Sequence, residues 1–158
     1  MKQTILVLGM AMAMVQARAQ TPPEAGCTVS SRDHYNCRHD EFAHLLAQAK
    51  TVRVSTGRMD LFGKQQMTRL VNDLGKQVVT ADQRADLVFE LEWIDRSGRI
   101  DIGPSDVAVG RLNVYDPLRG EGDRGLVWVE TFDSGEQTPW PAITASLIQH
   151  FRAHLVEK

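Results

Sequence analysis

The sequence has few of the features by which a function is usually recognised. Among its 158 residues there are only two cysteines and three tryptophans, and its formal net charge at pH 7 is −2. Nucleic acids and anionic membranes are bound through clusters of basic residues, which makes this slightly acidic chain a poor candidate for either partner. No apolar stretch approaches the roughly 20 residues that a membrane-spanning helix needs. We therefore expect no nucleic-acid partner and no stable membrane insertion.

Two patterns resemble catalytic or cofactor sites but lack the context that their chemistry requires. Residues 120–125 fit G-x-G-x-x-G, yet a dinucleotide site needs this pattern between a strand and a helix. Here the pattern joins two predicted strands and contains two acids that repel phosphate. Glu90 and Glu92 share one face of a predicted strand, where alternating acids are typical of a solvated surface. With no G-x-S-x-G nucleophile motif either, we predict no catalytic residue and no cofactor, and do not expect an enzyme.

Two histidines near the C-terminus, His150 and His154, stand four positions apart on a predicted helix. This spacing can hold one metal ion. However, Phe151 between them belongs to the apolar stripe of the helix, and no acid falls between them to act as a base. Late-helix histidines also suit the negative end of the helix dipole. The pattern therefore favours an ordinary helix end, and we predict no metal site there.

The first 19 residues show the three parts of a secretory signal. Lys2 gives a basic start, an apolar run follows from Ile5 to Val15, and Ala17-Arg18-Ala19 resembles a small-residue cleavage site. We predict cleavage after Ala19. The mature chain is then expected to be exported, periplasmic or secreted, soluble, and of the length of one domain.

Both cysteines, Cys27 and Cys37, lie in the segment that follows, residues 20–39. An even pair in an exported chain is most simply a disulfide, because that compartment is oxidising. Such a bond would staple a segment that has little apolar content of its own. Lipidation of Cys27 is an alternative, because Ala25-Gly26 precede it as small residues do in bacterial lipoproteins. Glu24 fits that motif poorly, and membrane anchoring therefore stays open.

A metal site is the other alternative for this segment. His34, Cys37, His39 and His44 fall close together, with Cys27 nearby, and imidazole and thiolate are ligands of zinc or copper(I). None of the spacings is C-x-x-C or H-x-x-x-H, and an oxidised cysteine pair cannot supply thiolates. Metal binding through this N-terminal cluster remains the second interpretation.

Residues 40–158 show the alternating patterns of a single α/β domain. Helices are predicted for 40–49 with Asp40 as cap, for 60–74 with Asp60 as cap and Gly75 as terminator, and for 141–156. Strands are predicted for 51–55, 87–94, 106–115 and 126–132. The order β-α-β-β-β-α predicts an α/β (α+β) fold, with one mixed sheet of about four to five strands and helices packed on one face. The unit at 51–94 should cross over right-handedly and pair in parallel, directly or across one intervening strand, and the later strands should form an antiparallel meander.

Trp140 is the residue that we single out as a possible partner contact. It stands between Pro139 and Pro141, which hold it rigidly, and tryptophan often anchors interfaces. The alternative is that Trp140 packs as the lead-in to the last helix.

Several short stretches resemble a broad group of small exported bacterial domains. They include Arg84-Ala85-Asp86-Leu87-Val88-Phe89, and Gly110 to Asp116 followed by Gly125-Leu126-Val127-Trp128. The group includes periplasmic lipoproteins of unknown function and is similar to the N-terminal domain of the TolB type. The resemblance covers roughly residues 45–156 and implies a non-enzymatic envelope domain. We therefore expect an exported, non-catalytic domain that binds another envelope protein.

Overall fold

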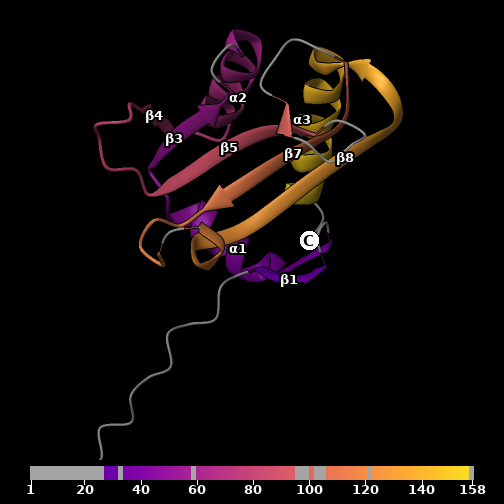
Figure 1. The fold of residues 1–158 in the computed structure, drawn as a ribbon. Helices are drawn as coiled ribbons and strands as arrows, with labels where there is room; N and C mark the ends of the chain where they lie inside the picture. The colour runs from indigo at the N-terminus through magenta and orange to yellow at the C-terminus, as the bar shows by residue number, and fades with distance from the viewer. Residues whose placement is uncertain are drawn as a thin grey trace, which may run out of the picture.

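The computed structural model describes residues 27–31, 34–57, 60–94, 100–101, 106–120 and 122–156. The predicted signal, residues 1–19, lies outside the described residues. The elements in chain order are β1 (Cys27–Ser31), β2 (His34–Cys37), α1 (His39–Gln48), β3 (Thr51–Thr56), α2 (Leu61–Asp73), β4 (Gln77–Val79), β5 (Leu87–Ile94), β6 (Ile100–Asp101), β7 (Asp106–Tyr115), the 3-10 helix η1 (Gly122–Gly125), β8 (Leu126–Pro139) and α3 (Trp140–Val156) (Figure 1).

The main sheet has six strands, in the order β4-β3-β5-β7-β8 with β6 added beside β5, and β1 and β2 form a separate two-stranded sheet. The predicted fold class is confirmed: one mixed sheet packs against helices. β3 pairs in parallel with β5, as the strand–helix–strand pattern predicts, and it also pairs in parallel with β4, which was not predicted. β5, β7 and β8 form the antiparallel meander. The prediction missed β4, β6 and the β1–β2 hairpin, and it ended the last strand too early.

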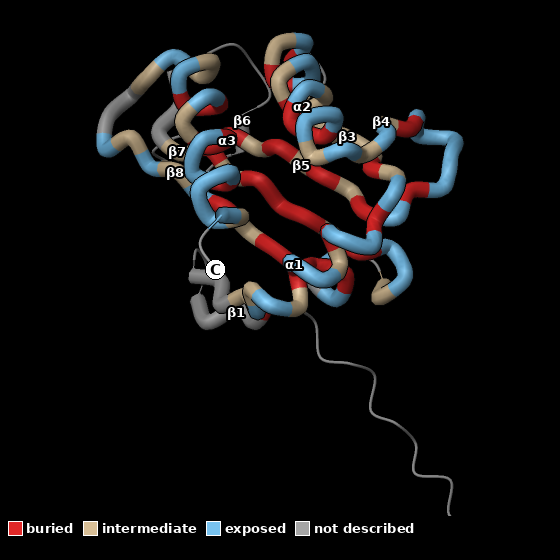
Figure 2. Tube along the Cα trace, turned by 180° about the vertical axis from the view of Figure 1, so that it is seen from behind, coloured by how far each residue is buried: buried red, intermediate tan, exposed pale blue. Residues whose placement is uncertain are grey.

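The core lies between the three helices and one face of the sheet (Figure 2). Alternate residues of β5 are buried, as period two predicts for a strand with one covered face. The helices contribute one apolar stripe each, which comprises Phe42 and Leu46 from α1, Met67, Leu70 and Val71 from α2, and Ile143, Leu147, Ile148 and Phe151 from α3. Since every helix is amphipathic about this layer, all three cover the same side of the sheet.

The helix starts show which caps the sequence predicts correctly. Asp60 caps α2 as expected, since its Oδ1 accepts a 2.7 Å hydrogen bond from the backbone N–H of Gly63. A Cβ at position 63 would collide with the Asp60 carboxylate, so a larger residue there would require the capping side chain to move. The predicted cap at Asp40 is wrong. Helix α1 begins one residue earlier, with Arg38 at the capping position, and Asp40 lies in the first turn. An acid there still favours the helix through the dipole.

The N-terminal hairpin places Cys27 directly opposite Cys37, and their Sγ atoms lie at disulfide distance. The predicted cysteine pair is thus present. Just after the hairpin, His39 contacts α3: its Nε2 donates a 2.9 Å hydrogen bond to the backbone carbonyl of His154. Nearby, the ring of Phe42 stacks on Trp128 with centroids 4.9 Å apart. Among the described helices, none is both long and apolar enough to cross a membrane.

Candidate functional site

The three helices lie on one side of the main sheet (Figures 1 and 2), and we call the other side the open face. It carries Glu90 and Glu92, while Phe89, Leu91 and Trp93 enter the core between and beside them. The sequence predicted this division of β5 correctly. Which side each residue takes follows from the alternation of side chains along a strand.

Both glutamates of the open face are held by residues of β7. Glu92 forms a 3.0 Å ion pair with Arg111 and accepts a 2.9 Å hydrogen bond from Nδ2 of Asn113. Glu90 accepts a 3.1 Å hydrogen bond from the hydroxyl of Tyr115. Burial, followed by the neighbouring Glu90 carboxylate, raises the pKa of Tyr115, which therefore stays a hydrogen-bond donor. The two carboxylates and their partners form a fixed polar platform.

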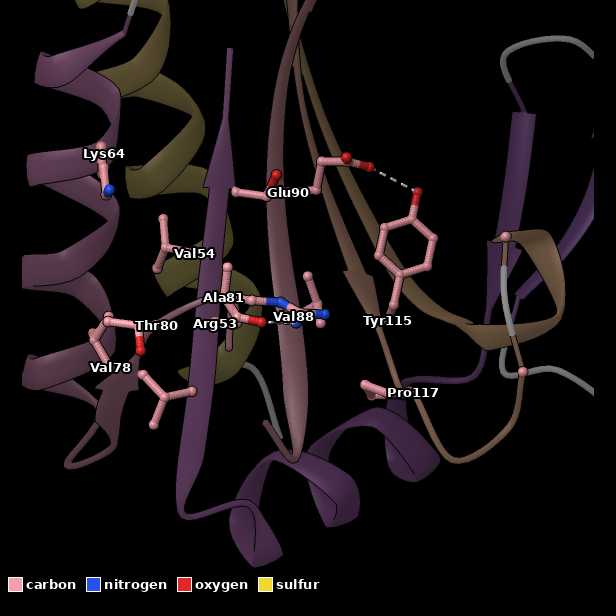
Figure 3. Close-up of a pocket in the computed structure, with 14 residues that line it drawn as sticks. Arg53, Val54, Lys64, Val78, Thr80, Ala81, Val88, Glu90, Tyr115 and Pro117 are labelled. Carbon is pink, nitrogen blue, oxygen red and sulfur yellow. Dashed lines mark hydrogen bonds between the residues drawn. The ribbon is translucent and has the colours of Figure 1, made fainter. Parts of the chain in front are cut away.

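A groove of about 890 Å³ lies on this platform at its β3 side (Figure 3). One wall is the segment that connects β4 to β5, which crosses β3 because β4 and β5 lie on opposite sides of that strand. The opposite wall is the loop after β7. The lining residues are Arg53, Val54, Ser55, Lys64, Val78, Val79, Thr80, Ala81, Val88, Glu90, Tyr115, Pro117, Gly120 and Gly122. Mixed polar and apolar walls of this kind are typical of ligand-binding clefts.

The groove opens onto a free edge of β3. β4 is only three residues long and pairs with Thr51 to Arg53, so β3 continues past it from Val54 to Thr56. A second hollow of about 260 Å³ follows this edge toward the start of α2, and it shares Val54, Ser55 and Lys64 with the groove. Within the described ranges, no strand pairs with this part of β3 on the β4 side. We call this stretch, Val54 to Thr56, the β3 edge.

Two cations flank the β3 edge. Arg53 lies in the groove and donates one 3.3 Å hydrogen bond from Nη1 to the carbonyl of Ala81. Lys64 projects from α2 beside Val54 (Figure 3). In the part of the chain that the structure describes, neither Arg53 nor Lys64 forms an ion pair with a carboxylate. Their charges are therefore available to a ligand.

Asp60 closes the far end of the second hollow. Its Oδ1 is used in capping α2, whereas its Oδ2 is buried and has no hydrogen-bond partner among the described residues. Burial raises the pKa of Asp60, and the hydrogen bond from Gly63 opposes this shift. The β3 edge is thus accompanied by two cations and by a buried carboxyl group.

The structure does not assemble the alternative N-terminal metal site from the residues that it describes. The Cys27 and Cys37 sulfurs are bonded to each other, so they offer no thiolates. The His39 ring bonds to a backbone carbonyl of α3, and the His44 ring lies 3.0 Å from the amide of Gln48. The side chain of His34 lies outside the described residues. Within the described chain, no group of three or more His, Cys, Asp or Glu residues is placed to hold a metal ion.

The G-x-G-x-x-G stretch is a loop, as the sequence indicates. It follows β7 and ends in the short helix η1 before β8, and the backbone N–H of Asp116 donates a 2.7 Å hydrogen bond to the carbonyl of Gly125. Arg119 fixes the loop to α1 through a 2.6 Å ion pair with Glu41. Of the described residues of this stretch, Gly120 and Gly122 line the groove.

Trp140 begins α3 and is partly buried. Its ring packs edge to face against Phe62 of α2 and Trp93 of β5, with ring centroids 5.3 Å and 5.6 Å apart, respectively. These contacts agree with the alternative that Trp140 packs at the start of the last helix, and its role as a partner contact stays a prediction. It lines neither the groove nor the second hollow.

The β3 edge and its two cations were not anticipated from the sequence. The available signal was Gln77-Val78-Val79, a run long enough to start a second parallel strand but too short to cover all of β3. Compared with known proteins, the chain matches no family model and has no significant match among curated proteins.

Proposed function

We propose that this protein is an exported, non-catalytic domain that binds an extended, acidic segment of another envelope protein along the β3 edge. The observation that carries the proposal is the edge itself, Val54 to Thr56, which continues beyond β4 and opens into a groove containing Arg53 and Lys64. Binding by strand addition uses such edges, because backbone hydrogen bonds supply affinity and side-chain pockets supply specificity.

Export is supported by two features of the N-terminal region. The first 19 residues carry the pattern of a secretory signal. The pairing of Cys27 with Cys37 suits an oxidising compartment. The resemblance of residues 45–156 to exported domains of the TolB N-terminal type agrees with the same location. A non-catalytic role is supported by the open face, where Glu90 and Glu92 serve to hold β7 side chains.

The direction of the backbone groups on β3 supports strand addition. The carbonyl of Lys50 accepts a hydrogen bond from Gln77 on the β4 side, and that of Thr51 accepts one from Asp86 on the β5 side. Successive residues of a parallel strand direct their N–H and C=O groups to alternate sides. The carbonyl of Val54 and both backbone polar groups of Thr56 therefore point past the end of β4. An incoming strand could pair with them in line with β4.

The charges beside the edge specify the chemistry of the partner. Arg53 stands on the open face of the sheet, whereas Lys64 comes from α2 on the helix side. Neighbouring residues of an added strand project to opposite faces. Two consecutive acidic residues on that strand would therefore meet one cation each. We expect the bound segment to be extended, with an acidic pair flanked by residues that favour strands.

The test measures binding of a synthetic peptide to the mature, oxidised chain by calorimetry and by backbone amide NMR. The probe is a terminally blocked heptapeptide in which an Asp-Glu pair is flanked by valine and threonine. We expect saturable binding with shifts centred on Val54 to Thr56. Replacing Asp-Glu by Asn-Gln in the peptide should weaken binding about tenfold, because both charge contacts are lost.

Matched protein variants separate the edge from general electrostatics. Arg53→Gln combined with Lys64→Gln should weaken binding about tenfold. Arg69→Gln removes an exposed cation of α2 that lines neither hollow, and it should leave binding unchanged. Thr56→Pro removes an N–H that points to the free edge, a position where proline is tolerated in sheets. Binding that survives both Thr56→Pro and the loss of the two cations would contradict the proposal.

The compartment is tested separately, by the intact mass of the protein recovered from its native envelope with and without reductant. A mass that matches residues 20–158 less two hydrogens would support export with an intact disulfide. A lipid adduct beginning at Cys27 would instead replace both the disulfide and the released, unanchored state. An uncleaved chain recovered from the cytoplasm would contradict export, whatever the peptide measurements show.

A further inference from the structure

Helix α3 crosses β8 with His150 and His154 on the side that faces the strand. The ring of His150 packs edge to face against Phe132, with ring centroids 5.0 Å apart. The ring of His154 packs edge to face against Trp128, with ring centroids 6.1 Å apart. Both histidines line one open hollow of about 320 Å³, together with Phe132, Ser146, Gln149 and Ala153. Two imidazoles from successive turns of one helix thus share a solvent-accessible space.

A buried carboxylate orients one of these imidazoles. Glu130 of β8 is only 4% exposed, and its Oε2 lies 2.7 Å from Nδ1 of His154 and 3.4 Å from Nε1 of Trp128. The carboxylate accepts from both nitrogens. A neutral His154 that donates from Nδ1 carries its lone pair on Nε2, the nitrogen directed away from Glu130. The side chain of His154 remains 46% exposed, so this lone pair is accessible.

We propose that His150 and His154 bind a divalent transition-metal ion, Cu²⁺ in preference to Zn²⁺, with Glu130 as the partner that orients His154. Histidines four positions apart on a helix can hold one ion, and metal-binding histidines usually donate their other ring nitrogen to a carboxylate or carbonyl. An ordinary surface histidine at a helix end needs no such buried acid. Helix α3 has no acid between the two histidines, and the carboxylate that contacts His154 comes instead from Glu130 of β8.

The surroundings of the hollow support a cation. Among the residues that the structure describes, no lysine or arginine lines it, and Arg152, the cation between the two histidines in sequence, pairs with Asp73 of α2. His39 further fixes the end of α3 by bonding to the His154 carbonyl. The described residues offer no third His, Cys, Asp or Glu ligand. The donor set that we propose is two imidazoles completed by water, which suits Cu²⁺ better than a closed structural zinc site does.

The experiment titrates the metal-free, oxidised mature chain with Cu²⁺ in the presence of competing glycine, and then with Zn²⁺. Electron paramagnetic resonance of the Cu²⁺ form reads the number of coordinating nitrogens. We expect one ion per chain with two imidazole nitrogens, and weaker binding of Zn²⁺, as the general order of metal affinities requires. His150→Asn and His154→Asn should each lower Cu²⁺ affinity at least tenfold. His44→Asn, which removes an exposed histidine of α1, should leave the site unchanged.

Glu130→Gln tests the orienting role, and removal of such a partner is expected to weaken binding roughly 10- to 100-fold. Thermal unfolding of each variant shows whether the fold persists. If Glu130→Gln fails to fold, His150→Asn decides the matter, because His150 is exposed. Wild-type Cu²⁺ affinity in both histidine variants, or in a folded Glu130→Gln variant, would overturn the proposal.

Discussion

The indole N–H of Trp93 on β5 donates a 3.3 Å hydrogen bond to the hydroxyl of Thr144 on α3, and both residues are buried. Thr144→Val keeps the shape of the side chain but removes the acceptor. The Trp93 N–H then stays buried without a partner, which costs about 1–3 kcal/mol. We expect the free energy of unfolding in urea to fall by that amount.

A double-mutant cycle isolates this bond. In a Trp93→Phe background no indole N–H remains, so Thr144→Val should then cost much less than it does in the wild type. The difference is expected to be about 1 kcal/mol, which is a typical interaction energy between contacting residues. Equal costs in the two backgrounds would show that the hydroxyl acts only through packing.

Asp86 anchors the start of β5 to the start of β3. Its Oδ2 accepts hydrogen bonds from the backbone N–H groups of Lys50 and Thr51, each at 2.9 Å, and from the Thr51 hydroxyl at 3.0 Å. The bonds from Lys50 and Thr51 lower the pKa of Asp86. We expect Asp86→Ala to cost about 1–2 kcal/mol at pH 7, since a charged acceptor is lost at an exposed site.

The pH dependence of Asp86 has a definite sign. Because its pKa is lower in the folded state than in the unfolded chain, where it is about 3.9, its contribution to stability is complete above that value. The contribution is lost as the pH falls through the unfolded and then the folded pKa. Urea unfolding between pH 7 and 2.5 should therefore show the difference between wild type and Asp86→Ala shrinking below about pH 4. Thr51→Val, which leaves both backbone donors, should produce a smaller effect at pH 7. A difference that stays constant with pH would contradict the role of the carboxylate charge.

Long periodic patterns predicted the fold well. The alternation along Leu87 to Ile94 specified which side of β5 meets the helices. The apolar stripe predicted for α3 includes four residues that are buried, Ile143, Leu147, Ile148 and Phe151. Asp60 was predicted correctly as a cap because an aspartate just before an amphipathic helix can accept a hydrogen bond from the first turn of that helix. In each case the signal lies within one element, so neighbouring residues are sufficient to read it.

The parts that were missed depend on contacts between distant segments. β4 is too short to show a period of two, and its strand character comes from pairing with β3. β8 extends to Pro139 through polar residues that read as a loop, because pairing with β7 overrides their weak preference. The contact of Glu130 with His154 joins a strand to a helix, so no spacing of neighbouring residues in the sequence could predict it. Both proposed sites rest on such contacts.

The disulfide between Cys27 and Cys37 should stabilise the N-terminal hairpin and its packing on the domain. On the chain-entropy estimate, a link between residues ten positions apart contributes about 2–3 kcal/mol. Combined Cys27→Ala and Cys37→Ala substitutions should lower the stability measured in urea by that amount. Reductant should have a similar effect on the wild type and none on the double variant. An unchanged midpoint in both would mean that the hairpin unfolds independently of the domain.

Trp140 joins three elements, because its position at the start of α3 brings its ring against Phe62 and Trp93. We expect Trp140→Ala to cost about 2 kcal/mol, less than a fully buried tryptophan, since the residue is only partly buried. Trp140→Phe keeps an aromatic ring in contact with both neighbours and should recover most of that loss in urea unfolding.

The Trp140→Phe variant also separates packing from partner binding. If the protein is exported as we propose, its crosslinking to an envelope partner should be retained in folded Trp140→Phe when the residue only packs, and lost when its indole anchors the partner. Peptide binding at the β3 edge should be unchanged in either case, because Trp140 lines neither of the hollows beside that edge.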